Sequence, residues 1–207
     1  MKKTNLFLTS IFALVVLSGC ASMADSMNKM AGLGVVSTEK STFDGSETVT
    51  VTPNWLYESE GTWSANSVKM GAHWSDAAPN YVALDLSYAS DTTGYSATYL
   101  GLQGVDININ GNKSSYSANN QTSLDSSGYN TVSKTIYTKS QNSIVVPFSV
   151  LEEMVNAADC RIRIHTSKGY EDSIFSIERS SSGQSTAKFS IKEFIEKVQS
   201  YKKAKGI

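Results

Sequence analysis

Apolar and polar residues alternate along much of the chain beyond residue 38, the pattern of strands with one buried and one solvent-facing side. Between Tyr81 and Tyr88 the larger aliphatic residues occupy even positions, whereas Asp85 and Ser87 occupy odd ones. Comparable β-prone runs, separated by Gly, Asn, Ser and Asp, predict strands over residues 47–52, 67–74, 81–88, 104–110, 132–138 and 143–146.

Two hairpins are predicted from the residues between such runs. Asn110 and Gly111 follow the alternating run 105–109, and both residue types tolerate the positive φ of a two-residue turn. A turn at residues 167–169 separates the runs 160–166 and 170–179 in the same way. The polar stretch 112–131 predicts a long surface loop or a ragged edge hairpin.

Two helices are predicted late in the chain. Ser149 with Glu152, and Ser190 with Glu193, have the spacing of capping boxes, which predicts helices over 150–157 and from Ser190 to about residue 203. The second helix carries one apolar stripe, made of Ile191, Phe194, Ile195 and Val198. The order of elements predicts an α+β fold, mostly antiparallel β as a sandwich or a sheet, with two helices in the C-terminal third.

The N-terminus has a different pattern. Lys2 and Lys3 precede a nearly pure apolar run over residues 6–17. At ~1.5 Å per residue this run reaches only ~18 Å, too short for the ~30 Å core of a bilayer, so it predicts a removable export signal. It ends in Leu17-Ser18-Gly19-Cys20, and this spacing resembles the lipobox of bacterial lipoproteins.

The lipoprotein resemblance implies a defined modification. The Cys20 thiol would take a diacylglyceryl group, cleavage would fall between Gly19 and Cys20, and the new amino group would be acylated. Such a three-chain cysteine anchors a protein to the membrane permanently. Ala21 stands where an Asp would retain the lipoprotein in the inner membrane of enteric bacteria, so the resemblance implies the periplasmic side of the outer membrane.

We therefore divide the chain into a signal peptide (1–19), a lipidated tether (20–34) and a single globular β-rich domain (35–207). In the tether, Met23, Met27 and Met30 follow the spacing of one helix face. This spacing predicts a short helix whose methionines rest on the bilayer or on the domain, although a flexible linker stays open.

Charge and cysteine content narrow the classes of function. Removal of the signal peptide takes away Lys2 and Lys3 and no acid, leaving 16 basic and 19 acidic side chains, a net charge of about −3. No basic field is present to attract nucleic acid. Because Cys20 is consumed by acylation, only Cys160 remains, and its strand pattern places it on the same inward face as Ile162 and Ile164.

No motif predicts a metal, a cofactor or a catalytic residue. The run from Asp106 to Gly111 matches the first half of a calcium loop, but the twelfth position is Ser117 in place of Glu. A zinc site would need both histidines, His73 and His165, and a carboxylate brought together by folding. A Ser-His-Asp triad has no G-x-S-x-G elbow to support it.

The strand from residue 160 to residue 166 carries a candidate ligand surface. Arg161, Arg163 and His165 share one face, with Lys168 at the turn beyond, and together they suit a phosphate, a carboxylate or an acidic partner. The alternative is a solvated face neutralised by acids across the hairpin, namely Glu171, Asp172 and Glu178.

Seven of the ten tyrosines lie between Tyr81 and Tyr137, a composition that suits glycan stacking or a protein interface. We expect a lipid-anchored, non-enzymatic binding or accessory module that faces the periplasm, with the membrane and another envelope protein or a glycan as partners. A cell-envelope hydrolase and a purely structural or interaction lipoprotein remain as alternatives.

Overall fold

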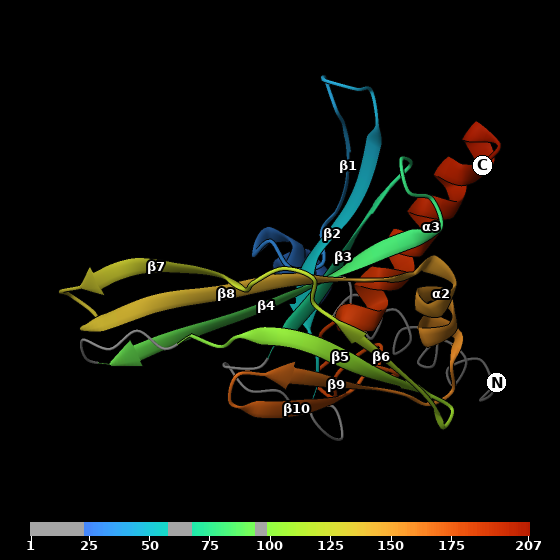
Figure 1. The fold of residues 1–207 in the computed structure, drawn as a ribbon. Coiled ribbons are helices and arrows are strands. Elements are labelled where there is room, and N and C mark those ends of the chain that lie inside the picture. The colour runs from blue at the N-terminus through green and yellow to red at the C-terminus, as the bar shows by residue number, and fades with distance from the viewer. Residues whose placement is uncertain (1–22, 58–67, 94–98) are drawn as a thin grey trace, which may run out of the picture.

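The computed structural model describes residues 23–57, 68–93 and 99–207, with side chains left out at 91–93. Within these ranges ten strands form two antiparallel sheets (Figure 1). Sheet A has the order β1 (Val36–Lys40), β2 (Glu47–Trp55), β3 (Lys69–Ser75), β4 (Tyr81–Thr93), β8 (Thr135–Pro147), β7 (Ser123–Asn130). Sheet B has the order β10 (Gly169–Ile174), β9 (Cys160–Thr166), β5 (Leu102–Ile109), β6 (Asn112–Ser117). The predicted α+β class with mostly antiparallel strands is confirmed.

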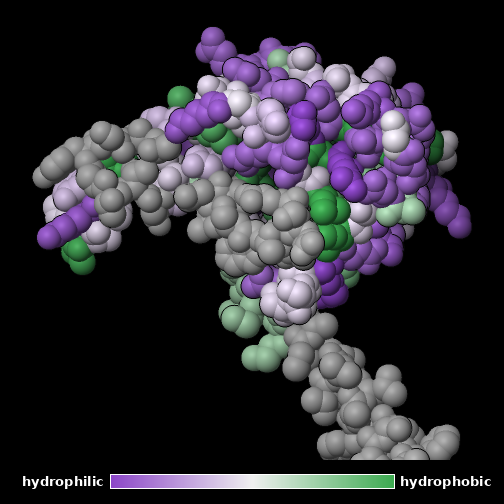
Figure 2. Space-filling model, turned by 90° about the horizontal axis from the view of Figure 1, so that it is seen from below, coloured by the Kyte–Doolittle hydropathy of each residue, from purple (hydrophilic) through white to green (hydrophobic). Residues whose placement is uncertain are grey.

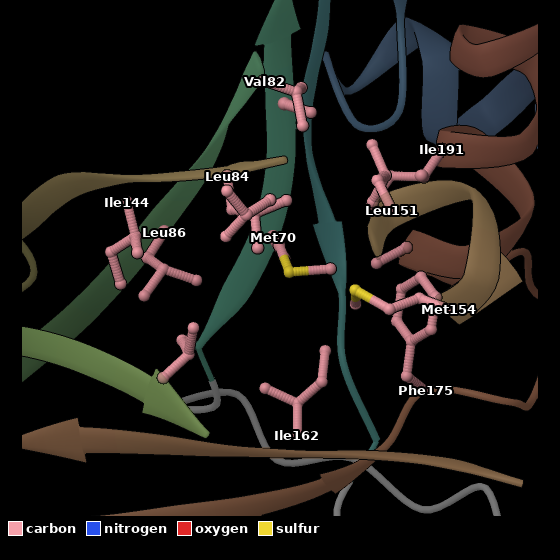
Figure 3. Close-up of a cluster of buried hydrophobic side chains, with 14 of the residues drawn as sticks. Met70, Val82, Leu84, Leu86, Ile144, Leu151, Met154, Ile162, Phe175 and Ile191 are labelled. Carbon is pink, nitrogen blue, oxygen red and sulfur yellow. The ribbon is translucent and has the colours of Figure 1, made fainter. Parts of the chain in front are cut away.

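Sheet B and two helices share one face of sheet A. Helix α3 (Ala187–Lys205) lies against β1, β2 and β3, whereas β5 and β6 lie against β8. Helix α2 (Phe148–Asn156) follows β8 directly and contacts α3. Figure 3 shows the core between these layers, a single cluster to which sheet A contributes Met70, α2 contributes Met154, sheet B contributes Ile162 and α3 contributes Ile191.

Strand β8 is one element where the sequence predicted two. Its residues alternate between exposed and buried along the whole strand, but the buried positions between Thr138 and Asn142 are polar. These side chains have partners in β5 and in the chain just before it: the Ser140 hydroxyl accepts from the Leu100 amide (3.0 Å), and the Asn142 amide donates to the Leu102 carbonyl (2.7 Å). The inward face of β8 is therefore continuous, but its middle positions are hydrogen-bonded polar residues. The alternation of apolar residues that predicts a strand is interrupted there.

The stretch 112–131 forms two strands that belong to different sheets. β6 returns from the Asn110-Gly111 turn along β5, and β7 pairs with β8 at the edge of sheet A. Most of their side chains are exposed, as is usual for edge strands, so the stretch carries little hydrophobic signal.

Both predicted capping boxes are wrong. Helix α2 begins after Pro147 and α3 begins after Thr186, so Ser149 and Ser190 lie inside the helices. Ser190 is buried, and its hydroxyl accepts a hydrogen bond from the amide of Asn54 (2.8 Å). The predicted apolar stripe of α3 is confirmed, since Ile191, Phe194, Ile195 and Val198 are all buried.

A third helix, over residues 23–30, lies outside the C-terminal third, in the segment where the methionine spacing predicted a short helix or a flexible linker. It is held to the domain by polar contacts. Asn28 is buried and donates to the Ser185 hydroxyl (3.1 Å), and the Asp25 carboxylate accepts two hydrogen bonds from Arg179 (2.7 and 2.9 Å).

Candidate binding surface on sheet B

Strand β9 has one buried face and one exposed face, as the sequence predicted. Cys160, Ile162 and Ile164 are buried in the core, and burial raises the pKa of the Cys160 thiol to about 12. The residues that alternate with them point outward, namely Arg161, Arg163 and His165. Each keeps more than two fifths of its side chain exposed. The predicted common face of these three residues is present in the fold.

All three basic side chains are engaged by acids: Arg161 Nε donates to Asp159 (3.2 Å), and the other two have partners on adjacent strands. Arg163 lies opposite Asp172 in the β9–β10 pairing and donates two hydrogen bonds to it, both 2.7 Å long. The guanidinium also lies 4.0 Å from the centre of the Tyr170 ring, a cation–π contact. Arg163 holds the pKa of Asp172 below its usual range. Part of the predicted neutralisation across the hairpin is thus confirmed.

His165 is paired across β5 and not across the hairpin. Its Nε2 lies 2.9 Å from a carboxylate oxygen of Asp106. The pKa of Asp106 is lowered, first by the Ser115 hydroxyl on β6 and then by His165. Glu178, which the sequence offered as a neutralising acid, instead lies 3.5 Å from Lys192 on α3.

An open depression of about 360 Å³ lies at this surface. Its polar lining comes from four adjacent strands and consists of Asp106, Asn108, Lys113, Arg161, Arg163, Asp172 and Ser173. This volume falls within the range of small-molecule sites. The strands that build it are paired along their length, so the side chains stand on a rigid base.

One row of this surface consists of hydrogen-bond donors. Asn108 pairs with Lys113 on β6 and with Arg161 on β9, so the two cations flank the amide. The side-chain oxygen Oδ1 of Asn108 accepts from the Gly111 amide (2.9 Å), so the side-chain NH₂ is the group still able to donate. The Lys113 side chain is exposed, and its ammonium has no hydrogen bond or ion pair to another described residue. We call Lys113, Asn108 and Arg161 the donor row.

Sequence reasoning missed Lys113 and the donor role of Asn108. The predicted two-residue turn at Asn110-Gly111 carried the signal, because such a turn pairs Asn108 with Lys113. The pairing of Asn108 with Arg161 had no local signal, since β5 and β9 are far apart in the chain.

The first half of a calcium loop is explained by the hairpin that it forms. Asn110 and Gly111 have φ values of 50° and 95°, as a type I′ turn requires. The side-chain oxygen of Asn110 accepts from the Asp159 amide (3.1 Å), and Asp106 meets His165. Within the described ranges no three His, Cys, Asp or Glu side chains gather closely enough to hold a metal ion.

The second histidine belongs to the other sheet. His73 Nδ1 lies 2.8 Å from Asp85, and the Ser143 hydroxyl donates to the same carboxylate (2.6 Å) on the outer side of sheet A. The hydrogen bond to Asp85 raises the pKa of His73. With the core between them, His73 and His165 cannot share a metal ion.

The order of this His73 network differs from that of a hydrolase triad. In a triad the imidazole lies between the serine and the carboxylate and takes the serine proton. Here the carboxylate lies in the middle, and both His73 and Ser143 bond to Asp85. Asp106 has the same central place between His165 and Ser115 on sheet B. This geometry activates neither serine.

The tyrosines of the region 81–137 do not form one groove in the part of the chain that the structure describes. Tyr88 and Tyr116 pack on the core. Tyr129 lies opposite the buried Ile136, so it shares the inner face of sheet A, whereas Tyr137 is the next residue and projects from the outer face. Tyr95 lies outside the described residues.

Comparisons with known proteins found no match: no family model, no curated protein and no solved structure is significantly similar to this chain. None of the helices in the described ranges has the length and the apolar composition needed to cross a bilayer. The predicted signal peptide, Gly19 and Cys20 lie outside the described residues.

Proposed function

We propose that this chain is a lipid-anchored, non-enzymatic binding module that faces the periplasm from the outer membrane, and that the donor row binds an anionic glycan. The anchor is supported by the lipobox-like segment that ends at Cys20. The binding role is supported by the depression on sheet B, where donors from three strands face the same space.

The single observation that carries the ligand class is the row Lys113–Asn108–Arg161. Two cations with an amide between them offer N–H donors to one acidic group, a carboxylate or a phosphate. Asp159 accepts from Arg161 Nε at 3.2 Å, which orients the guanidinium while its side chain stays 64% exposed. The row is therefore accessible to a ligand from solvent.

The acids that line the depression do not cancel this preference. Asp172 is paired with Arg163, and Asp106 is hydrogen-bonded by His165 and Ser115. Their oxygens are occupied by neighbours and hold those neighbours in place. A glycan has hydroxyl groups that can exchange hydrogen bonds with such a mixed rim, and its narrow chain fits a depression better than a flat protein surface does.

The experiment is a calorimetric titration of the acylated protein in detergent micelles with oligogalacturonate, which carries a carboxylate on each sugar. A neutral maltooligosaccharide of equal length is the ligand control. The variant Lys113→Gln/Arg161→Gln should bind at least about tenfold more weakly, because a hydrogen bond to a charged group contributes about 1.5 kcal/mol or more.

Lys168→Gln is the matched protein control, since it removes one exposed cation from the β9–β10 turn outside the depression. It should leave the affinity unchanged. Equal affinity for the neutral sugar, or an equal loss in the Lys168 variant, would contradict the proposed ligand class.

A further inference from the structure

The helix over residues 23–30 shows its apolar side to the outside. Met23, Met27 and Met30 are 68%, 62% and 88% exposed, and their spacing puts them on one face. Figure 2 shows a group of moderately hydrophobic side chains, in pale green, where the described chain begins, apart from the mostly hydrophilic surface of the domain. We call Met23, Met27 and Met30 the methionine face.

The opposite, polar side of the helix fixes its orientation. Asp25 is bound by both terminal nitrogens of Arg179, and the guanidinium of Arg179 also lies 4.4 Å from the centre of the Phe189 ring. Lys29 Nζ lies 3.1 Å from the Glu193 carboxylate on α3, and Asn28 bonds to Ser185. An amphipathic helix on a soluble domain normally buries its apolar stripe, so this helix is turned the other way.

We propose that the methionine face lies in the headgroup region of the bilayer and orients the domain on the membrane. This inference rests on the proposed lipid anchor at Cys20. Met23 is three residues from Cys20, so at most about 11 Å of extended chain separates it from the acylated residue. The helix therefore begins close to the headgroup layer, which is about 5 to 7 Å thick on each side of the hydrocarbon core.

The chemistry of the face suits a lipid surface. Methionine side chains are flexible and polarisable, so they adapt to an irregular apolar environment without a fixed complementary pocket. An interfacial helix buries its apolar side at the boundary of headgroups and acyl chains. The domain surface around Arg179, Ser185 and Glu193, to which the helix is attached, is then the side next to the membrane.

The test uses the full acylated chain with Met27→Cys, labelled with an environment-sensitive fluorophore and reconstituted into phosphatidylethanolamine–phosphatidylglycerol vesicles. Cys160 is fully buried, so the dye reacts with the new thiol. The label should show blue-shifted emission, quenching by nitroxide lipids and protection from iodide. Removal of the neighbouring apolar side chains, by Met23→Ser and Met30→Ser in the same protein, should reverse these shifts.

Phe43→Cys and Val132→Cys are matched controls, because both are apolar residues, 98% and 92% exposed, outside the helix. Their labels should stay open to iodide. Vesicle flotation of the same samples tests the lipid anchor at Cys20 separately from the position of the methionine face. If the protein floats but the label at residue 27 is as open to iodide as the controls, the inference is overturned and the anchor stands. If the protein does not float, both are overturned.

Discussion

At the scale of single residues, several side chains have roles that only distant neighbours define. Asn54 is fully buried and donates to both the Ser190 hydroxyl (2.8 Å) and the Thr186 carbonyl (3.2 Å). Gly34 has a φ of +64°, and a Cβ there would overlap the Ser190 hydroxyl. The sequence predicted Ser190 as a helix cap because a capping box is a local pattern. The contact with Asn54 spans 136 positions, so no local pattern indicates it.

The His73–Asp85 pair predicts a pH dependence of stability. The hydrogen bond that His73 donates to Asp85 raises the pKa of His73 in the folded state above its usual ~6.5. The pair therefore stabilises fully below that usual pKa, and the stabilisation is lost as pH rises through the raised value. His73→Gln should lower the free energy of unfolding at pH 5.5 by less than about 1 kcal/mol, since the imidazole is 44% exposed.

Urea denaturation of the wild type and the His73 variant at pH 5.5 and pH 9 measures this difference. The loss should be larger at pH 5.5. An equal loss at both values would show that the protonated imidazole adds nothing beyond packing.

At the scale of elements, local periodicity predicted the existence of most strands and of the two later helices. It failed where an element has no contrast between its faces or where polar groups are buried. β7 is exposed along its whole length, and β8 buries Ser140 and Asn142 in the middle of its inner face. Helix starts were misplaced because buried contacts, and not caps, begin α2 and α3: neither N-cap residue makes a side-chain capping bond.

The buried stripe of α3 predicts the effect of a substitution. Phe194 has no exposed surface, so Phe194→Ala should lower the free energy of unfolding by about 3 to 5 kcal/mol through lost burial and a residual cavity. Phe189→Ala is the control on the same helix, because Phe189 is only half-buried beneath Arg179. Chemical denaturation should show a clearly smaller loss for it. Similar losses in the two variants would mean that α3 is not docked through Phe194.

At the scale of the whole molecule, two surfaces lie on different parts of the fold. The donor row belongs to sheet B, while the methionine face belongs to the helix attached near the start of α3. β4, β8 and β7 extend beyond sheet B as an arm (Figure 1, left), with Leu124 and Val132 exposed on it. This arm therefore carries a further exposed apolar surface, separate from the methionine face.

The proposed anchor predicts the processing of the whole chain. Cys20→Ser should leave a larger, unprocessed protein that no longer incorporates labelled palmitate, because the serine cannot form the thioether. Cys160→Ala should be processed and labelled normally, since that thiol is buried in β9. Electrophoresis with palmitate labelling in a bacterial host measures both properties, and normal processing of the Cys20 variant would contradict the lipobox interpretation.

The sequence by itself determined what depends on neighbours in the chain: most strands, the type I′ turn at Asn110-Gly111, the burial of Cys160 and the common face of Arg161, Arg163 and His165. The tertiary structure alone decided which faces meet. It paired His165 with Asp106, put Asn108 between Lys113 and Arg161, and turned the methionines of the helix over residues 23–30 outward. Side-chain direction within one element follows from its period, whereas pairing between elements depends on contacts between distant segments, which no local pattern records.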